Sequence, residues 1–267
     1  MIPLIDADVL RYEVGFAGEA GWQQDGVPPF DYVAELLHMR IDNICGVVGA
    51  TAPPILYLTG KHNFRNQIAT RQPYKDRPSA KPWHFYNITA YMKGNYDVRL
   101  TEGLEADDLM AIKQCKHRGN PLYQGPETII CTRDKDLRAV PGWHYGWELG
   151  NQAQFGPELV DDLGWLKLSP DRKSIKGTGL RFFYSQCLTG DRVDSIKGVD
   201  GIGPVKVQEI LGEAQTELEL FGQVRAQYQA KYGDDGDRFL LESGRLLWMT
   251  RELNEDGTPV LWEFPNS

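Results

Sequence analysis

The sequence has few of the residues that build redox centres and zinc sites. It contains only four cysteines, and they lie too far apart for a CxxC redox pair or a zinc knuckle. None of the five histidines lies at metal-ligand spacing, which argues against a zinc site. We therefore expect the cysteines to be reduced core thiols and the histidines to be incidental. These residues are Cys45, Cys115, Cys131, Cys187, His38, His62, His84, His117 and His144.

Long apolar runs are also absent. The longest apolar stretch, around residues 44–58, is interrupted by Pro53 and Pro54. Asp6 and Asp8 occupy the region in which a signal peptide would need its apolar segment. We therefore expect a soluble protein of the cytoplasm, or of the host cytoplasm if the chain is viral. With 267 residues and 41% hydrophobic content, the chain can bury a substantial core.

Basic residues are outnumbered, with 29 Lys and Arg against 37 Asp and Glu and a net charge of -8. This balance argues at first against a nucleic-acid ligand, whose phosphates require a basic surface. The basic residues are nevertheless concentrated in two stretches. A run of charged residues is ordinarily a solvated face, so charge alone does not decide whether the protein binds nucleic acid. The stretches contain Lys61, Arg65, Arg71, Lys75, Arg77 and Lys81, and Lys167, Arg172, Lys173, Lys176 and Arg181.

Strand and helix patterns alternate in the first part of the chain. Buried strands are predicted at 1–6, 54–58, 128–131 and 143–147, and helices at 30–44 and 104–116. The alternation predicts an α/β fold with a parallel sheet, whose ligands gather at the carboxyl ends of the strands. From about Leu180 the pattern changes to helices at 204–211, 217–231 and 237–251, separated by glycine-rich turns. We therefore predict two domains, 1–177 and 178–267.

Four groups of carboxylates fall where this fold would bring strand ends together. Asp6 ends the first strand and Asp8 follows it, and the other groups lie in LEADDL, TRDKDL and TGDRVDSI. Any single group has an ordinary explanation, such as a helix N-terminal charge or a turn cap. So many carboxylates at one sheet edge would repel one another without cations, and such hard oxygen ligands suit Mg²⁺ or Mn²⁺. The last three groups supply Glu105, Asp107, Asp108, Asp134, Asp136, Asp191 and Asp194.

A glycine-rich segment, IKGVDGIGPVKVQEIL, follows the last acidic group. Gly198, Gly201 and Gly203 would let the backbone approach a phosphate, and a helix beginning at Pro204 would point its first amides at it. Lys206 would add charge. The segment resembles a helix-hairpin-helix element, which holds the DNA backbone without reading sequence. The alternative is an ordinary glycine-rich turn between two helices.

The motifs EADD, DKD and GDxxDxIxGVxGIG, in this order within residues 2–212, resemble the flap endonuclease and 5′ to 3′ exonuclease family. This family includes viral replication exonucleases and the 5′ nuclease domain of bacterial DNA polymerase I. The resemblance implies a PIN-like sheet domain followed by a helical region with a helix-hairpin-helix motif at about 188–212. It also implies cleavage of DNA ends, flaps or nicks with two Mg²⁺ or Mn²⁺ ions. RNase H activity on RNA:DNA hybrids, K⁺ at the hairpin and replication proteins as partners are compatible with it.

The resemblance also assigns metal ligands by position. The first metal would be held by a cluster that begins at Asp6, and the second by Asp191 and Asp194, with Asp136 as a shared candidate. The resemblance does not decide whether Asp8 is a metal ligand or only a neighbour of the ligands. Many relatives have a glycine after the first aspartate, whereas this chain has Ala7 followed by this extra carboxylate. The first cluster comprises Asp6, Glu105, Asp107, Asp108, Asp134 and Asp136.

The segment QPYKDRP resembles a basic motif of the family, which makes Lys75 and Arg77 candidates for contacting the scissile phosphate, with Asp6 as the third catalytic candidate. A short basic arch for a 5′ single strand is expected at about 61–101. Its aromatic residues Trp83, Phe85 and Tyr86 could stack on a base, although core packing is the ordinary explanation. The predicted DNA contacts are Arg65, Lys75, Arg77, Lys197, Gly198, Gly201, Gly203 and Lys206.

Three alternatives remain. LIDADVL fits the DxD motif of haloacid dehalogenase-type phosphatases, with Asp6 as nucleophile and Asp8 as general acid. That interpretation leaves EADD, DKD and the glycine-rich segment unexplained. A ribonuclease with a similar acidic site would not require a DNA hairpin, and a catalytically decayed junction-binding protein would not require a complete carboxylate set.

Overall fold

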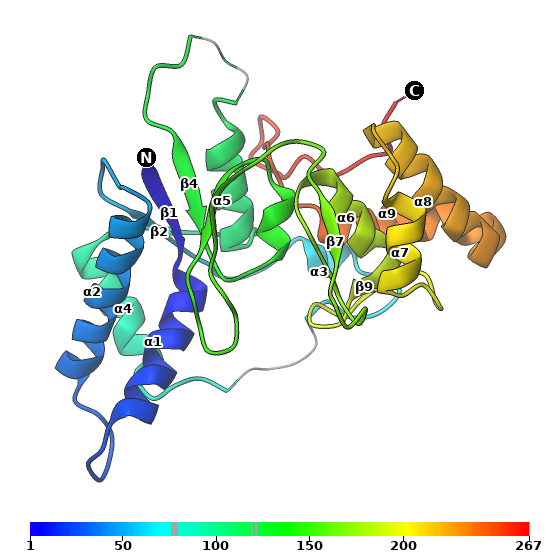
Figure 1. Cartoon of the computed structure of the whole chain (residues 1–267). Helices are drawn as coiled ribbons and strands as arrows, with labels where there is room; N and C mark the ends of the chain where they lie inside the picture. The colour runs from blue at the N-terminus through cyan, green and yellow to red at the C-terminus, as the bar shows by residue number, and fades with distance from the viewer. Residues whose placement is uncertain (76–79, 119, 121, 267) are drawn as a thin grey trace. The chain divides into compact units, whose positions relative to one another are not determined.

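The computed structural model describes residues 1–75, 80–118, 120 and 122–266 (Figure 1). The chain divides into two compact units. Unit 1 comprises Met1–His62, Ser79–Asp134 and Gly142–Leu159, and unit 2 comprises Asn63–Pro78, Lys135–Pro141 and Val160–Ser267. These units differ from the predicted continuous domains 1–177 and 178–267, because two early segments and residues 160–177 belong to unit 2.

Unit 1 is built on a six-stranded sheet with the order β3-β2-β1-β4-β5-β6. β1 runs parallel to both β2 and β4, and the outer pairs β2-β3 and β4-β5 are also parallel. The four predicted strands are confirmed, whereas β3 and β6 were not predicted. The strands are β1 (Ile2–Asp6), β2 (Ile55–Leu58), β3 (Asp97–Leu100), β4 (Thr128–Cys131), β5 (Gly142–Gly146) and β6 (Phe155–Val160).

The strand order reverses direction between β1 and β4. Such a switch point opens a crevice outside the carboxyl ends of the strands, where open α/β sheets bind their ligands. Asp6 is the last residue of β1, and Thr132 directly follows β4. The fold therefore places Asp6, the first predicted carboxylate, at the crevice where sheets of this kind bind ligands.

Helices cover both faces of this sheet. α1 (Ala7–Gly21), α2 (Phe30–Val47) and α4 (Phe85–Asn95) pack together on one side, and α5 (Ala106–Cys115) contacts β1, β2 and β4 on the other (Figure 1). The predicted helices at 30–44 and 104–116 are confirmed. Along the chain, the core includes Leu10, Ile41 and Ile88, each at most 1% exposed.

The second half of the segment predicted as an arch, about 61–101, contains a core helix and a sheet strand. α4 buries Phe85, Ile88 and Met92 in the core of unit 1, and β3 pairs with β2 in the sheet. Apolar residues at this spacing form one face of a helix, a signal that the basic residues nearby obscured. Residues 85–100 therefore belong to the sheet unit.

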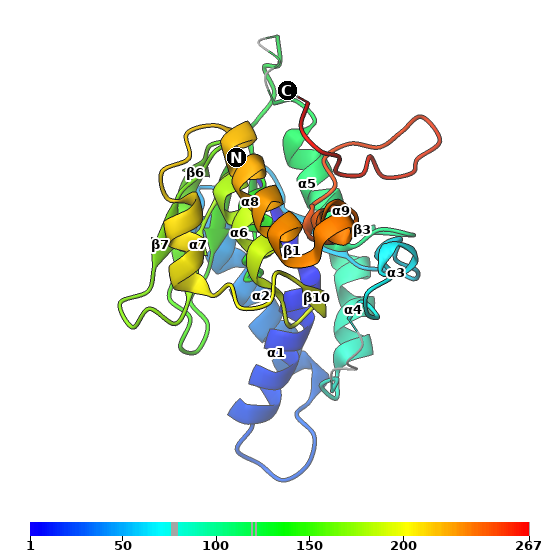
Figure 2. The ribbon, with the colours of Figure 1, turned by 90° about the vertical axis from the view of Figure 1, so that its right-hand side faces the viewer.

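Unit 2 is mainly helical. Its central helix α6 (Gly179–Thr189) is buried from Gly179 to Leu188 and is contacted by α7 (Pro204–Leu211), α8 (Glu217–Tyr232) and α9 (Gly236–Leu247) (Figure 2). The helices predicted at 204–211, 217–231 and 237–251 are confirmed, although α9 ends earlier. The shorter elements of unit 2 are α3 (Arg65–Ile68), η1 (Asp136–Ala139), η2 (Gly233–Asp235), β7 (Leu166–Leu168), β8 (Ile175–Gly177), β9 (Gly190–Asp191) and β10 (Ile196–Lys197).

All four cysteines are free thiols, as predicted. Cys131 and Cys187 are buried, and Cys45 and Cys115 are half-buried. Within the residues that the structure describes, we find no helix with the length and apolar character needed to cross a membrane.

Candidate functional site

Asp6 links the end of β1 to the loop after β4. It caps α1 by accepting the Val9 N–H at Oδ1 over 3.0 Å. The Thr132 hydroxyl donates to Asp6 Oδ2 over 2.7 Å, and Thr132 Oγ1 accepts the backbone N–H of Asp134 over 2.9 Å. A chain of hydrogen bonds thus joins Asp6 to the DKD loop at the switch point of the sheet.

Asp8 lies in the first turn of α1 and is also tied to the sheet edge. Its Oδ2 accepts the backbone N–H of Thr59, just after β2, over 2.9 Å. Its Oδ1 lies 2.6 Å from Arg11 Nη2, and the Arg11 guanidinium lies 4.2 Å from the centre of the Phe85 ring. Asp8 therefore has a structural partner of opposite charge, which the spacing of three residues could have indicated.

The pKa values of Asp6 and Asp8 are both raised. Burial raises the pKa of Asp6 to about 6, helped by the charge of Asp8 and opposed by the hydrogen bonds from Val9 and Thr132. Burial also raises the pKa of Asp8, opposed mainly by Arg11 and reinforced by Glu105. Buried acidic groups in this arrangement are stabilised by a cation between them.

The EADD motif begins α5, as predicted. Asp108 is fully buried, and its Oδ2 accepts the backbone N–H of Glu105 over 3.1 Å as part of a capping box. Thr59 Oγ1 accepts the N–H of Ala106 over 2.9 Å, which fixes this helix start to the end of β2. Asp108 thus has the helix-capping role that was its ordinary explanation, while Asp107 is half-buried.

Unit 2 contains the second set of carboxylates. Gln186 Nε2 donates to Asp136 Oδ1 over 2.6 Å, and the backbone N–H groups of Val193 and Asp194 donate to Asp191 Oδ1 over 2.7 and 3.2 Å. The Lys135 ammonium donates to Asp191 Oδ2 over 2.7 Å and lies 3.3 Å from Asp136 Oδ1. One side-chain cation therefore bridges two predicted metal ligands, a contact that the sequence did not indicate.

Two further predicted site residues meet in unit 2. The Lys75 backbone N–H donates to the Asp194 carbonyl over 3.2 Å, and Lys75 Nζ lies 3.7 Å from Asp194 Oδ2. Tyr74, which is buried, donates its hydroxyl to the same carboxylate oxygen over 3.1 Å. Tyr74 and Lys75 of the basic motif are thereby fixed beside Asp194 of the last acidic group. Arg77, the other predicted residue of this motif, lies outside the described residues.

The chemistry of both carboxylate sets suits a hard divalent cation, because their side-chain donors are oxygen atoms. Within the described residues, no three His, Cys, Asp or Glu side chains are arranged as a metal cluster. The ammonium shared by Asp136 and Asp191 nevertheless acts as a stand-in ion, since it shows that this pair accepts one cation between them.

The three glycines of the hairpin have different surroundings. A Cβ on Gly198 would lie 2.3 Å from the Leu188 carbonyl oxygen, so only glycine fits there. Gly201 has φ +86°, which favours glycine. Gly203 has φ -111° and ψ -178°, and a Cβ on it would meet no heavy atom within 4 Å. The fold does not require glycine at 203, and the space beside it is open.

The hairpin leads directly into α7. Pro204 occupies the first turn of this helix. No side chain caps the N-terminal amides of α7. Lys197 and Lys206 are exposed on either side of the glycines. These residues supply the amides and positive charge that a phosphate contact needs.

Each of the two basic stretches of the sequence contains an arginine that is buried in the structure. Arg65 is fully buried and donates from Nε to the Leu246 carbonyl and from Nη2 to the Trp248 carbonyl over 2.9 and 2.8 Å, which corrects its predicted DNA contact. Arg181 is also buried and donates to the carbonyls of Leu211 and Gly212 at the end of α7. A guanidinium can satisfy several carbonyls at once, which makes it suitable for this structural role.

The aromatic residues near the start of α4 separate into two kinds. Phe85 is 4% exposed and packs in the core, whereas Trp83 and Tyr86 are 71% and 68% exposed. The core-packing explanation therefore holds for Phe85 alone.

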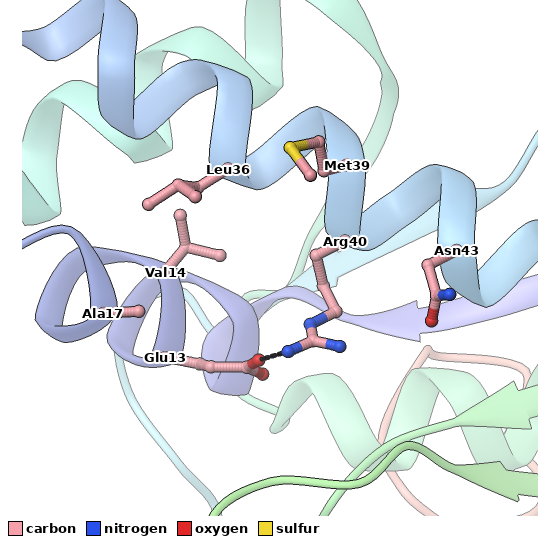
Figure 3. Close-up of a pocket in the computed structure, with 7 residues that line it drawn as sticks. All are labelled: Glu13, Val14, Ala17, Leu36, Met39, Arg40 and Asn43. Carbon is pink, nitrogen blue, oxygen red and sulfur yellow. Dashed lines mark ion pairs between the residues drawn. The ribbon is translucent and has the colours of Figure 1, made fainter. Parts of the chain in front are cut away.

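A cavity in unit 1 lies away from the carboxylates. It has a volume of about 350 Å³ between α1 and α2, and the Glu13–Arg40 ion pair of 2.7 Å closes one side (Figure 3). Val14, Leu36 and Met39 supply apolar lining. None of the predicted site residues lines it.

The fold defined by this sheet and its helices is that of a PIN-like α/β domain followed by a helical region, as the motifs implied. Solved structures share it. The flap endonuclease of bacteriophage T5, in a complex with DNA and metal ions, has a TM-score of 0.54 and 17% identity, over 92% of this chain and 98% of that one. The T5 5′-exonuclease with bound zinc has a TM-score of 0.54 and 18% identity, over 92% and 99%.

A sequence relative points in the same direction. The chain is 30% identical to DNA polymerase I of Rhizobium leguminosarum over 131 residues, which are 47% of this chain and 11% of that protein. The chain thus spans about a tenth of the length of this relative. The sequence matches no protein-family model. The resemblance to the 5′ nuclease family that the motifs indicated is confirmed in fold and in sequence.

Proposed function

We propose that this protein is a metal-dependent 5′ to 3′ exonuclease and flap endonuclease that hydrolyses DNA phosphodiesters. The observation that carries the proposal is the buried carboxylate of Asp6 at the switch point of the sheet, joined through Thr132 to the DKD loop. The related solved structures, which are named as nucleases and contain DNA or metal ions, support it.

Each unit would hold one divalent cation in a two-metal hydrolysis. Asp6 would lead the first ligand set, with Glu105, Asp107 and Asp134, while Asp136, Asp191 and Asp194 would form the second. Such ions activate water and stabilise the leaving oxygen. Lys75, fixed at Asp194, would help to neutralise charge on the phosphoryl oxygens. Asp108 would support the site by capping α5.

The hairpin would hold the backbone of duplex DNA. Gly203 leaves room for a phosphate beside the first amides of α7, and Lys197 and Lys206 would add charge. These contacts carry no sequence information, which suits recognition of ends, flaps and nicks by their structure. RNA:DNA hybrids present a similar backbone and remain a second substrate class. K⁺ at the hairpin and recruitment by replication proteins belong to this proposal as well.

A phosphatase with Asp6 as nucleophile would need Asp8 as a general acid. Asp8 is instead engaged at both carboxylate oxygens, by the Arg11 guanidinium at Oδ1 and by the Thr59 N–H at Oδ2, so neither oxygen is available to a leaving group. These contacts weigh against the phosphatase.

Substitution of a ligand tests the nuclease directly. We expect Asp134→Asn and Asp191→Asn each to abolish cleavage in Mg²⁺ while DNA binding stays measurable, because a metal ligand is lost and the hairpin is intact. Asp171→Asn, at an exposed carboxylate of the β7–β8 turn, is the matched control and should cleave normally. Normal turnover by both site variants would refute the assignment.

A further inference from the structure

Lys135 is an exposed lysine that contacts two buried carboxylates, those of Asp136 and Asp191. The side chains of Asp191 and Asp136 are 4% and 10% exposed, whereas that of Lys135 is 53% exposed. The lysine reaches them from the turn that precedes η1. Its ammonium therefore approaches the two carboxylates from the solvent side, which is the side from which an ion in solution would arrive.

The carboxylates do not depend on the lysine for their positions. Gln186 fixes Asp136, and the backbone N–H groups of Val193 and Asp194 fix Asp191. If the ammonium moved away, the oxygens that now accept it would keep their places. They would then form a buried pair of like charges, which requires another cation.

The electrostatics agree with this geometry. Burial alone would raise the pKa of Asp191, but the hydrogen bond and charge of Lys135, with two backbone N–H groups, hold it below its usual value. Burial lowers the pKa of Lys135, yet the charges of Asp136 and Asp191 raise it overall. Lys135 thus favours the charged form of Asp191.

We propose that the Lys135 ammonium is a built-in counter-ion that bridges Asp136 and Asp191 in the metal-free protein and must leave them before a divalent cation can bind. This inference rests on the proposed metal-dependent function. Lys135 keeps the acidic pair compatible with folding in the absence of metal, and it competes with metal for the same oxygens.

Asp6 and the Asp136–Asp191 pair consequently differ in what a divalent ion has to displace. The contacts described for Asp6 come from neutral donors, Val9 and Thr132, so no ammonium has to be displaced from it. We expect this difference to make the Asp136–Asp191 pair the weaker class of site, which fills at a higher concentration of divalent ion. Lys135 therefore sets the metal concentration at which the second set fills.

Mn²⁺ binding to Lys135→Met tests this competition without relying on catalysis. Free Mn²⁺ is counted by electron paramagnetic resonance, with Lys231→Met as a control that removes one exposed lysine of unit 2. We expect Lys135→Met to bind Mn²⁺ at the weaker class of site at least about tenfold more tightly. In an Asp191→Asn background the same substitution should have a smaller effect, because only the contact of Lys135 with Asp136 is then removed. Unchanged or weaker Mn²⁺ binding by Lys135→Met would overturn the proposal.

A second measurement uses the unaltered chain, in case Lys135→Met folds poorly. Amine acylation followed by mass spectrometry reports whether Lys135 is engaged, and Lys231 is the internal reference. We expect Lys135 to react slowly in EDTA and several-fold faster in saturating Mg²⁺, because the metal displaces it. Equal reactivity in both conditions would overturn the proposal, and failure of cleavage alone would affect only the proposed function.

Discussion

Asp6, the last residue of β1, and Thr132, the residue that follows the neighbouring parallel strand β4, are joined by a hydrogen bond of 2.7 Å. Both side chains are buried, at 2% and 5% exposed. The bond fixes one Asp6 oxygen, and the α1 cap fixes the other. A carboxylate held this rigidly in the interior is costly when charged, and this cost makes its contribution to stability measurable.

The stability of the metal-free protein should therefore depend on pH through Asp6. Its folded pKa of about 6 exceeds the ordinary value of 3.8, so its stabilising contribution is complete below about pH 4 and is lost as pH rises through 6. Relative to the unaltered protein, Asp6→Asn should gain about 2 kcal/mol of unfolding free energy between pH 4.5 and pH 7.5. Urea unfolding in EDTA measures it, and parallel pH profiles for the two proteins would contradict the assignment.

Two hairpin glycines should respond differently to alanine. Gly198→Ala should destabilise the protein by about 1–3 kcal/mol, because the new Cβ would overlap the Leu188 carbonyl. Gly203→Ala should change stability by less than about 0.5 kcal/mol while weakening duplex binding, because its Cβ would occupy the space proposed for a phosphate. Thermal unfolding and binding titrations separate the effects. Unweakened binding by Gly203→Ala would remove the main support for the hairpin contact.

Lys206 should contribute to DNA binding through charge alone. We expect Lys206→Ala to weaken duplex binding for every sequence and to lower the slope of log K against log salt by about 1. Fluorescence anisotropy between low and high salt measures the slope. Lys231→Ala, which removes an exposed lysine of α8, should leave it unchanged. A slope that Lys206→Ala does not alter would show that Lys206 contacts no phosphate.

Arg65 should matter for folding and not for DNA. Arg65→Met leaves two buried carbonyls, those of Leu246 and Trp248, without their donors, so we expect a loss of about 2–4 kcal/mol. The salt dependence of DNA binding should stay at its original value at a temperature where the variant is folded. A lower slope with full stability would reinstate Arg65 as a phosphate contact.

The sequence was most informative where local chemistry and fold agree. The buried run ending at Asp6 indicated both the strand and the position of its carboxylate, and Pro204 marked the first residue of α7. The motif order indicated the fold. These signals are local, because they depend on alternation of strands and helices and on residues favoured at helix starts.

The parts that the sequence did not indicate depend on tertiary contacts. Arg65 and Arg181 occur in basic runs, and only the fold shows that their guanidinium groups are buried among backbone carbonyls. Lys135 stands between two aspartates of the DKD motif, and its bridge to Asp191 spans 56 positions in the sequence. α4 was the exception, because the spacing of Phe85, Ile88 and Met92 carried a helical signal that its basic surroundings obscured.

Cleavage of labelled DNA tests the central claim most directly. Duplexes with a 5′ flap, a nick or a blunt end, and an RNA:DNA hybrid, are labelled at either end and incubated with Mg²⁺ or with EDTA. We predict Mg²⁺-dependent products with 5′ phosphates, released near the junction or from the 5′ end, and no products in EDTA. An intact set of nucleic acids in Mg²⁺, together with hydrolysis of a small phosphate ester, would contradict the nuclease and favour the phosphatase.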